Sequence, residues 1–394
     1  MKKIAIYLTA LVMSCAMYGC NEKNNSSSDS TENSGTDSAA INIVMGSGNS
    51  SSSDSASNSN ITDDGFSYTS VENGFSITGY TGNSESIKIP DNIDGTPVVA
   101  IENYAFKGCD FIKNAEIPDS VISIGYEAFE GTAFLAEKTD DFIILGKSLY
   151  KYNGSDASVT IPDNVNYISP NAFYQNDTLK EVTIKSSVQK IGSAAFSNCQ
   201  ALEKAVIEEG VEEILSGAFS SCTSLKTVEI PSTMKALRTA CFNGCEKLEE
   251  ISLPDNLESV EDRAFQDCKS LKSINLPDSI QYIGSYTFLN CESLESVSIP
   301  QGVNAIYSSA FNGCSSIKSI VIPENVESIF SGAFAGCTNL ENIEIPASVT
   351  NIVDAEDEYG KNPFDGCENL TIITPSGSEA EKYAQEHEIN VKNN

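Results

Sequence analysis

The stretch that decides the fold is residues 322–344, which read I-P-E-N-V-E-S-I-F-S-G-A-F-A-G-C-T-N-L-E-N-I-E. Its apolar residues recur at the same places every 23 residues along the chain. The opening residue of each unit is Ile161, Ile184, Ile207, Ile230, Leu253, Leu276, Ile299, Ile322 or Ile345. A single unit of this length cannot bury its own apolar face, whereas stacked units bury one another. The sequence therefore predicts a repeat solenoid.

Each unit contains the signals for two short extended segments and one turn. The alternation in Val228-Glu229-Ile230 is typical of a strand, and the proline that often follows removes a backbone donor and starts a turn. The V-x-x-I stretch forms a second extended side. The A-F-x-x-C segment is expected to make a short 3₁₀ or helical turn with phenylalanine inside the coil. We expect a β-rich superhelix of about twelve coils over residues 63–374.

These units closely resemble the BspA-like leucine-rich repeats of bacterial surface proteins, and the resemblance covers about residues 64–391. Residues 74–80 are similar to the first coil of that family, residues 142–154 to its variant coil, and residues 380–387 to its closing helix. We therefore predict a C-terminal capping helix and tail at 375–394. The pattern departs from the family at two cysteine positions, which hold Thr132 and Asn176.

The resemblance implies surface display and adhesion to host matrix proteins, host cells or other bacteria. It implies no catalytic residues and no cofactor, so the chain is expected not to be an enzyme. An alternative is a surface carbohydrate-capture protein or an accessory subunit of a surface enzyme system. A third is a purely structural spacer.

The amino-acid composition limits the classes of partner that the chain can bind. The 394 residues include 24 basic and 55 acidic side chains, which gives a formal charge of −31, and a single histidine. A field of this sign repels phosphate, so nucleic acid is not an expected partner. We expect a monomer that binds a protein or glycan at the cell surface and contacts membrane only through an N-terminal lipid.

The N-terminus predicts export. Lys2 and Lys3 precede an apolar run from Ile4 to Met17, too short for a permanent span and typical of a secretory signal. Gly19-Cys20 resembles the end of a bacterial lipobox, which implies a lipoprotein signal at 1–19, lipidation at Cys20 and a lipid-anchored protein at the extracytoplasmic cell surface. Ordinary signal cleavage elsewhere is the alternative. Residues 20–62, rich in Ser, Asn and Asp, are predicted to be a disordered tether.

The repeat cysteines are expected to be free, buried thiols. Nine cysteines stand three residues after a phenylalanine, at Cys109, Cys199, Cys222, Cys245, Cys268, Cys291, Cys314, Cys337 and Cys367. Parallel stacking at roughly 5 Å is wider than the Cβ separation of a disulfide. No metal site is predicted. The acidic insertion at 354–362 is interpreted as a solvated loop in preference to a calcium site, and His387 as a surface residue without a partner.

Two rows of side chains are candidates for function. Tyr282, Tyr307 and Phe330 flank inward-facing isoleucines on successive coils, so their rings are predicted to point outward and are candidates for binding a ligand. Incidental surface packing is the alternative. The second row, the charge ladder, alternates in sign at the position after each repeat leucine: Lys180, Glu203, Lys226, Glu249, Lys272, Glu295, Lys318 and Glu341. It is expected to fix the register of the coils, since a slip of one coil would place like charges together.

Overall fold

The computed structural model describes residues 60–355 and 360–394. These residues form two compact units: unit 1 holds residues 60–120 and 127–137, and unit 2 holds residues 121–126 and 138–394. The predicted signal, the lipidation at Cys20 and nearly all of the tether lie outside the described residues. The described chain already pairs at Asn60–Ile61, before the predicted boundary at residue 63, because backbone bonds to the next strand hold this exposed segment.

Unit 1 is a small β-rich unit. Strand β3 (Gly74–Tyr80) covers the segment predicted as the first coil and runs parallel to β6 (Thr96–Ile101). The short helix α1 (Ala133–Ala136) is capped by Thr132, whose hydroxyl oxygen accepts from the Leu135 N–H at 3.1 Å. The remaining strands are β1 (Asn60–Ile61), β2 (Phe66–Val71), β4 (Ser86–Lys88), β5 (Asn92–Ile93) and β7 (Asn114–Glu116).

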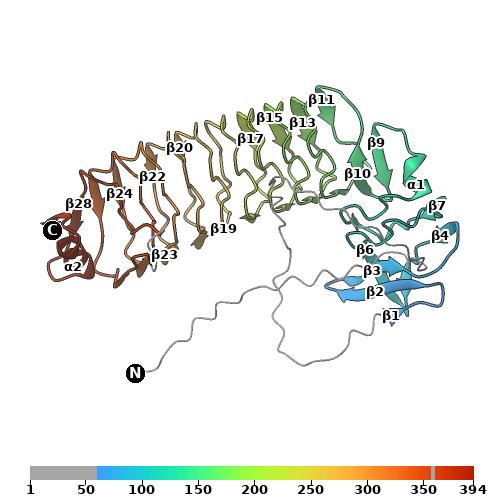
Figure 1. Cartoon of the computed structure of the whole chain (residues 1–394), viewed down its shortest axis with the longest axis horizontal. Helices are drawn as coiled ribbons and strands as arrows, with labels where there is room; N and C mark the ends of the chain where they lie inside the picture. Colours follow the sequence, from blue (N-terminus) through green and yellow to red (C-terminus); the bar gives the residue numbers. More distant parts are fainter. Residues whose placement is uncertain (1–59, 356–359) are drawn as a thin grey trace, which may run out of the picture. The chain divides into compact units, whose positions relative to one another are not determined.

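Unit 2 is a row of stacked coils with strands on two opposite sides (Figure 1). Side A, along the upper edge of the view, follows the V-x-I segments. Its strands are β11 (Ser158–Thr160), β13 (Glu181–Ile184), β15 (Lys204–Ile207), β17 (Thr227–Glu229), β20 (Ser273–Ile274), β22 (Ser296–Val297), β24 (Ser319–Val321), β26 (Asn342–Glu344) and β28 (Thr371–Thr374).

Side B follows the V-x-x-I segments. Its strands are β10 (Ser148–Tyr152), β12 (Tyr167–Ile168), β14 (Lys190–Ile191), β16 (Glu213–Ile214), β18 (Ala236–Leu237), β19 (Ser259–Val260), β21 (Tyr282–Ile283), β23 (Ala305–Ile306), β25 (Ser328–Ile329) and β27 (Asn351–Ile352). The pairing is parallel and keeps the sequence period, as in Val182 opposite Ala205 on side A and Ile191 opposite Ile214 on side B. Unit 2 also contains β8 (Ser123–Ile124) and β9 (Phe142–Leu145), which forms an antiparallel hairpin with β10.

The turn side of each coil adds a third set of bonds between coils. Ala194 and Asn198 have φ values of 54° and 60°, which alternate with ordinary turn residues and aim successive N–H groups at the next coil. Ala194 N–H donates to the Ser216 carbonyl and Phe196 N–H to the Ala218 carbonyl. Within the coil the turns are of the i→i+3 kind, as between the Cys199 N–H and the Phe196 carbonyl. Backbone bonds therefore join neighbouring coils on all three sides.

A column of buried phenylalanines fills unit 2. Their rings stack nearly parallel, with centroids 4.6 Å apart at Phe173–Phe196 and 5.8 Å apart at Phe334–Phe364. The column ends at Tyr383, which meets Phe364 edge-on at 5.9 Å and 67°. Tyr383 belongs to α2 (Glu379–Glu386), the predicted closing helix, and β29 (Asn390–Asn393) then pairs with β28. The core is thus one continuous cluster from Leu149 to Ala384.

The cysteine row lies beside this column and is held by hydrogen bonds. Each thiol donates to the carbonyl of the phenylalanine in the preceding coil, as from Cys245 Sγ to the Phe219 oxygen at 3.3 Å. The same bond is made by Cys199, Cys222, Cys268, Cys291, Cys314, Cys337 and Cys367. Burial raises the pKa of the Cys199 thiol to about 12, so these groups stay protonated donors at neutral pH.

The prediction of free, buried thiols is confirmed for these eight cysteines, and Cys241 is also free and buried. It is wrong for Cys109, which is disulfide-bonded. The bond does not join stacked repeat positions, because the next coil of unit 1 holds Thr132 at the equivalent place. The spacing argument against disulfides between neighbouring coils is unaffected by this bond.

The predicted fold class is confirmed: the described chain makes about 14 turns of about 23 residues, mostly strand with little helix. The sequence predicted about twelve coils, because the 23-residue pattern identifies only the coils that keep the full pattern.

Candidate functional site

The three predicted aromatic residues come together on side B. The centroids of the Tyr282 and Tyr307 rings are 5.1 Å apart, and those of Tyr307 and Phe330 are 5.6 Å apart with an angle of 10° between the planes. Tyr282 precedes an inward-facing isoleucine, and the other two residues follow one. Because alternate residues of an extended segment face the same way, all three side chains leave the core on the outer face of side B. We name this set the aromatic row.

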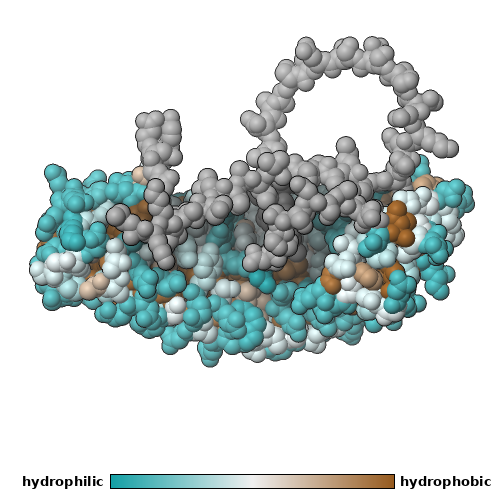
Figure 2. Space-filling model, turned by 90° about the horizontal axis from the view of Figure 1, so that it is seen from below, coloured by the Kyte–Doolittle hydropathy of each residue, from teal (hydrophilic) through white to brown (hydrophobic). Residues whose placement is uncertain are grey.

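The aromatic row is half-buried, although the sequence predicted rings that point outward. The rings cover one another's faces, since Tyr307 lies between a tilted Tyr282 and a parallel Phe330. Among the coloured residues of Figure 2, most of the surface is hydrophilic, with hydrophobic residues scattered among the polar ones.

Hydrogen bonds fix the first ring of the row. The Tyr282 hydroxyl donates to Asp262 Oδ1 at 3.1 Å, and the Ser285 N–H donates to the same oxygen at 2.8 Å. Burial, reinforced by the Asp262 charge, raises the pKa of Tyr282 above its usual value. The hydroxyl therefore remains a neutral donor, and its donated bond orients the ring.

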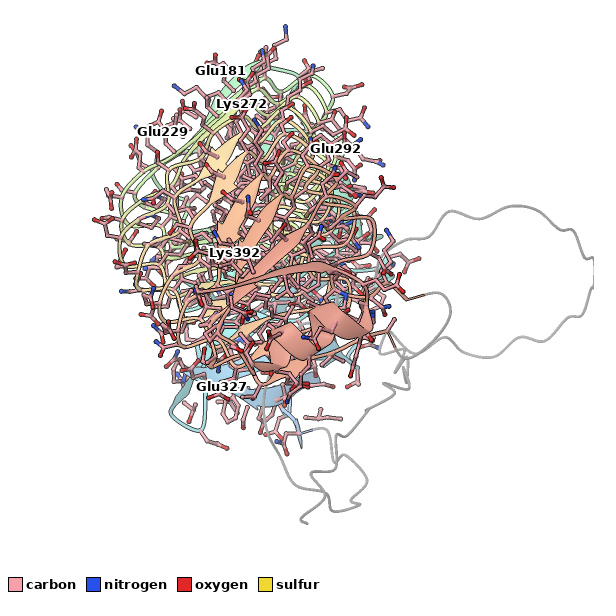
Figure 3. The ribbon with its side chains drawn as sticks, turned by 90° about the vertical axis from the view of Figure 1, so that its left-hand side faces the viewer. Glu181, Glu229, Lys272, Glu292, Glu327 and Lys392 are labelled. Carbon is pink, nitrogen blue, oxygen red and sulfur yellow. The ribbon has the colours of Figure 1, made fainter. Side chains whose placement is uncertain are left out.

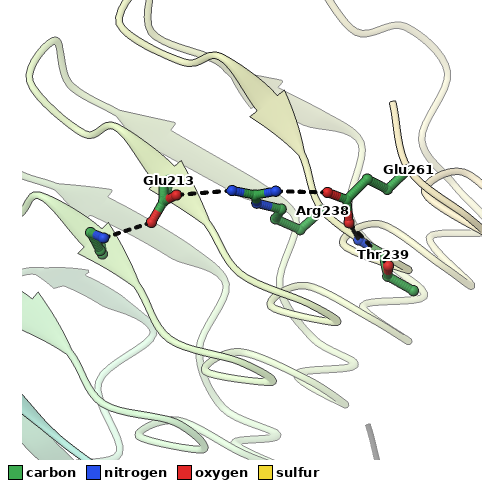
Figure 4. Close-up of polar contacts among 5 residues, drawn as sticks. Glu213, Arg238, Thr239 and Glu261 are labelled. Carbon is green, nitrogen blue, oxygen red and sulfur yellow. Dashed lines mark hydrogen bonds and ion pairs between the residues drawn. The ribbon is translucent and has the colours of Figure 1, made fainter. Parts of the chain in front are cut away.

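On the coils before the aromatic row, side B carries a linked set of charges, which we name the arginine network (Figure 4). Arg238 donates from one nitrogen to Glu213 at 3.0 Å and from the other to Glu261 at 2.8 Å. Lys190 lies 2.8 Å from the second oxygen of Glu213. Glu261 also accepts from the backbone N–H of Thr239 at 3.0 Å.

The arginine network changes the acidity of its members. Burial by itself would raise the pKa of Glu213, but hydrogen bonds from Lys190 and Arg238 outweigh burial and lower it. Sequence reasoning missed this set. A signal was present, because Lys190 and Glu213 are one repeat apart, as are Arg238 and Glu261.

The charge ladder flanks side A, on the opposite side of the coils. Figure 3 shows Glu181, Glu229 and Lys272 at one side of the ribbon and Glu327 at the other. Two pairs of neighbouring ladder residues form ion pairs: Lys226 with Glu203 at 2.6 Å and Lys272 with Glu249 at 2.7 Å. Among the described residues, the other ladder neighbours are farther apart than a direct ion pair. Their attraction acts at longer range, as from Lys180 on Glu203.

The acidic insertion is anchored at its first residue. Asp354 accepts from the Tyr383 hydroxyl at 2.7 Å, and its other oxygen lies 3.1 Å from His387 Nε2. The His387 ring also stacks on Tyr383 at 4.1 Å. The prediction that His387 has no partner is therefore wrong, because α2 folds back beside the start of the insertion. Within the described ranges no group of His, Cys, Asp or Glu could hold a metal, and residues 356–359 lie outside those ranges.

Stacked coils with parallel strands on two sides define a leucine-rich repeat solenoid. No helix in the described part of the chain is both long and apolar enough to span a bilayer. The model of the BspA type leucine rich repeat region, present in six copies, matches residues 75–139, 143–269 and 235–371. The chain belongs to this family, whose members are typically cell-surface proteins and generally serve as non-enzymatic scaffolds.

The chain is also similar in sequence to proteins with solved structures. The chain is 26% identical to a leucine rich cell surface protein from Faecalibacterium prausnitzii A2-165, covering 84% of this chain and 98% of that one, with a TM-score of 0.28. It is 25% identical to a leucine-rich repeat protein from Bacteroides ovatus, covering 85% and 99%, with a TM-score of 0.35. It is 30% identical to the T. pallidum leucine rich repeat protein, covering 57% and 97%, with a TM-score of 0.31. No curated protein matches the chain.

Proposed function

We propose that this chain is a lipid-anchored, cell-surface adhesion protein that binds other proteins, such as matrix or cell-surface proteins of a host or of other bacteria, through side B. The aromatic row is the observation that carries the proposal. Tyrosine and phenylalanine on a rigid scaffold are frequent anchors of protein interfaces, because they bury much area with few rotatable bonds.

The geometry of the row favours a protein ligand over a glycan. A sugar ring packs on the open face of an aromatic ring, and the faces of Tyr307 are covered by its two neighbours. Ring edges carry partial positive charge and pack well against aromatic and aliphatic side chains. A peptide segment lying along the row would present such side chains.

The test is binding of the purified chain to arrays of matrix proteins and glycans. The double variant Tyr307→Ser and Phe330→Ser should weaken binding to a matrix protein at least about tenfold, the loss expected when interface anchors are removed. The matched control is Ser308→Ala with Ser331→Ala, which changes the neighbouring positions of the same coils. Undiminished binding by the double variant, or binding to glycans alone, would contradict the proposal.

Anchorage is tested separately. Cys20→Ser, or growth with an inhibitor of lipoprotein signal processing, should release the chain from the membrane fraction or leave it unprocessed. Protease added to intact cells should digest the anchored wild-type chain. A Cys20→Ser chain that is processed like wild type and still stays in the membrane fraction would exclude the lipid anchor.

A further inference from the structure

The turn side has one position where the backbone restricts the choice of residue. From Phe173 to Phe334, the residue two places before each column phenylalanine has a left-handed φ, a region that suits glycine and disfavours long side chains. In unit 2 this position usually holds a small residue, namely Asn171, Ala194, Gly217, Ala240, Ser309 and Gly332. The exceptions are Arg263, with φ 59°, and Tyr286, with φ 60°, on neighbouring coils.

These two side chains contact each other. The Arg263 guanidinium lies over the Tyr286 ring, 4.8 Å from its centroid. Arg263 is exposed, and it forms no ion pair with any described residue, although the chain is strongly acidic. The other arginine, Arg238, bridges two carboxylates. An exposed cation held on a ring, at a backbone position that suits glycine, adds nothing to the buried core.

The pair lies next to the aromatic row. Asp262, the residue before Arg263, uses Oδ1 to accept from the Tyr282 hydroxyl and the Ser285 N–H. The Asp262 carboxylate, which is nearest to Arg263 in sequence, is thus turned toward Tyr282, the first ring of the aromatic row. Arg263 and Tyr286 accordingly extend the aromatic row around the turn with a guanidinium that has no carboxylate partner within the described chain.

We propose that Arg263, held on Tyr286, binds a carboxylate of a protein segment whose neighbouring aromatic or aliphatic side chain packs on the aromatic row. This rests on the proposed function and names the partner's chemistry. Arginine pairs with carboxylates through two parallel hydrogen bonds, and a ring beneath it keeps the plane oriented. A polyanionic glycan is disfavoured, because the coil that carries Arg263 also carries the carboxylates of Glu258, Glu261 and Asp262.

The experiment selects a random peptide display library on the immobilised full chain and measures the affinity of selected peptides for variants. Peptides carrying Asp or Glu beside an aromatic or aliphatic residue should be enriched, and should bind Arg263→Gln about tenfold more weakly than wild type. Amidation of their carboxylate should remove the difference. Equal affinity for wild type and Arg263→Gln, or selective capture of acidic glycans by wild type, would overturn the proposal.

Glycine variants separate a binding role from a structural one. Arg263→Gly and Tyr286→Gly should keep or raise the melting temperature, because glycine suits the left-handed backbone, while both weaken peptide binding. Ser309→Gly is the matched control at the same position of the next coil and should leave binding unchanged. A melting temperature lowered by Arg263→Gly alone would show that the pair serves the fold, and would overturn the proposal.

The same variants test the aromatic row and Arg263 separately. If the selected peptides lose affinity for the double variant Tyr307→Ser with Phe330→Ser but not for Arg263→Gln, the aromatic row is supported and Arg263 is rejected as a contact. If the peptides bind both variants as tightly as wild type, the aromatic row and Arg263 are both rejected as contacts.

Discussion

The two charged rows of unit 2 follow the same 23-residue period but have different structures. On side A the charge ladder resolves into separate lysine–glutamate pairs whose side chains are 43% to 58% exposed. On side B the arginine network links Lys190, Glu213, Arg238 and Glu261 through side chains that are 26% to 47% exposed. A lysine ammonium is a single point charge, whereas a guanidinium offers a fork that can bridge two carboxylates. Alternating charge along a row therefore provides possible ion-pair partners, and Arg238 joins them into a continuous network.

The largest effect should come from removing that link. Arg238→Gln leaves Glu213 and Glu261 without their shared cation, and should lower the free energy of unfolding by about 1–2 kcal/mol, after allowance for partial exposure. Arg238→Lys should recover part of the loss, since lysine can reach one carboxylate. Equilibrium urea unfolding measures both, and a lysine variant as stable as wild type would show that bridging does not matter.

A smaller effect is the pH dependence of the stability that the arginine network provides. The pKa of Glu213 is lowered in the folded chain, so its contribution is fully present above the unfolded value of about 4.3 and is lost as pH falls through the folded value. The stability gap between wild type and Arg238→Gln should narrow on acidification below about pH 4. Urea titrations at a series of pH values test this, and a gap that stays constant would exclude an ionic origin.

The inner cysteine row provides a comparison without charge. Burial raises the pKa of Cys245 well above its ordinary value, and the thiol donates to Phe219. The native chain should resist alkylation at mildly alkaline pH and react at these cysteines only in denaturant. Mass spectrometry of labelled peptides provides the measurement, and rapid native labelling of Cys245 would contradict the structure.

The smallest effect should come from the charge ladder. Lys272→Glu should destabilise slightly, and Glu249→Lys in the same molecule should restore the loss, because these two residues form the direct pair. Adding Glu295→Lys should change little more. Both effects should vanish near 1 M salt, where the screening length is roughly 3 Å. If Glu295→Lys proved essential for the rescue, the ladder would act as one network after all.

The periodic parts of the molecule were open to prediction from sequence, and the parts that depend on side-chain reach were not. The spacing of Phe173 and its repeats predicts the stacked column, and that of Cys199 and its repeats predicts the buried thiols, because backbone register alone places them. Which carboxylate a lysine reaches depends on rotamers, so the ladder's two pairs could not be read from alternation. His387 lies beside Asp354 because α2 folds back beside the start of the insertion, which the repeat period does not report.

The aromatic row shows the same division. Its clustering followed from register, but the mutual covering of its ring faces depends on side-chain angles that the sequence does not report. The left-handed backbone at Arg263 likewise became visible only with coordinates.

The edge-on ring of Tyr383 has a consequence for how such a gene can change length. Every column phenylalanine from Phe173 to Phe334 has a parallel ring on the next coil, so an exact duplication or loss of one 23-residue unit by recombination leaves the same contacts at the join. A perpendicular ring offers no parallel surface on which another coil could stack. Copy number can therefore drift within the array while its C-terminal end is inherited unchanged, and each added coil would move the aromatic row about 5 Å farther from one end of the array.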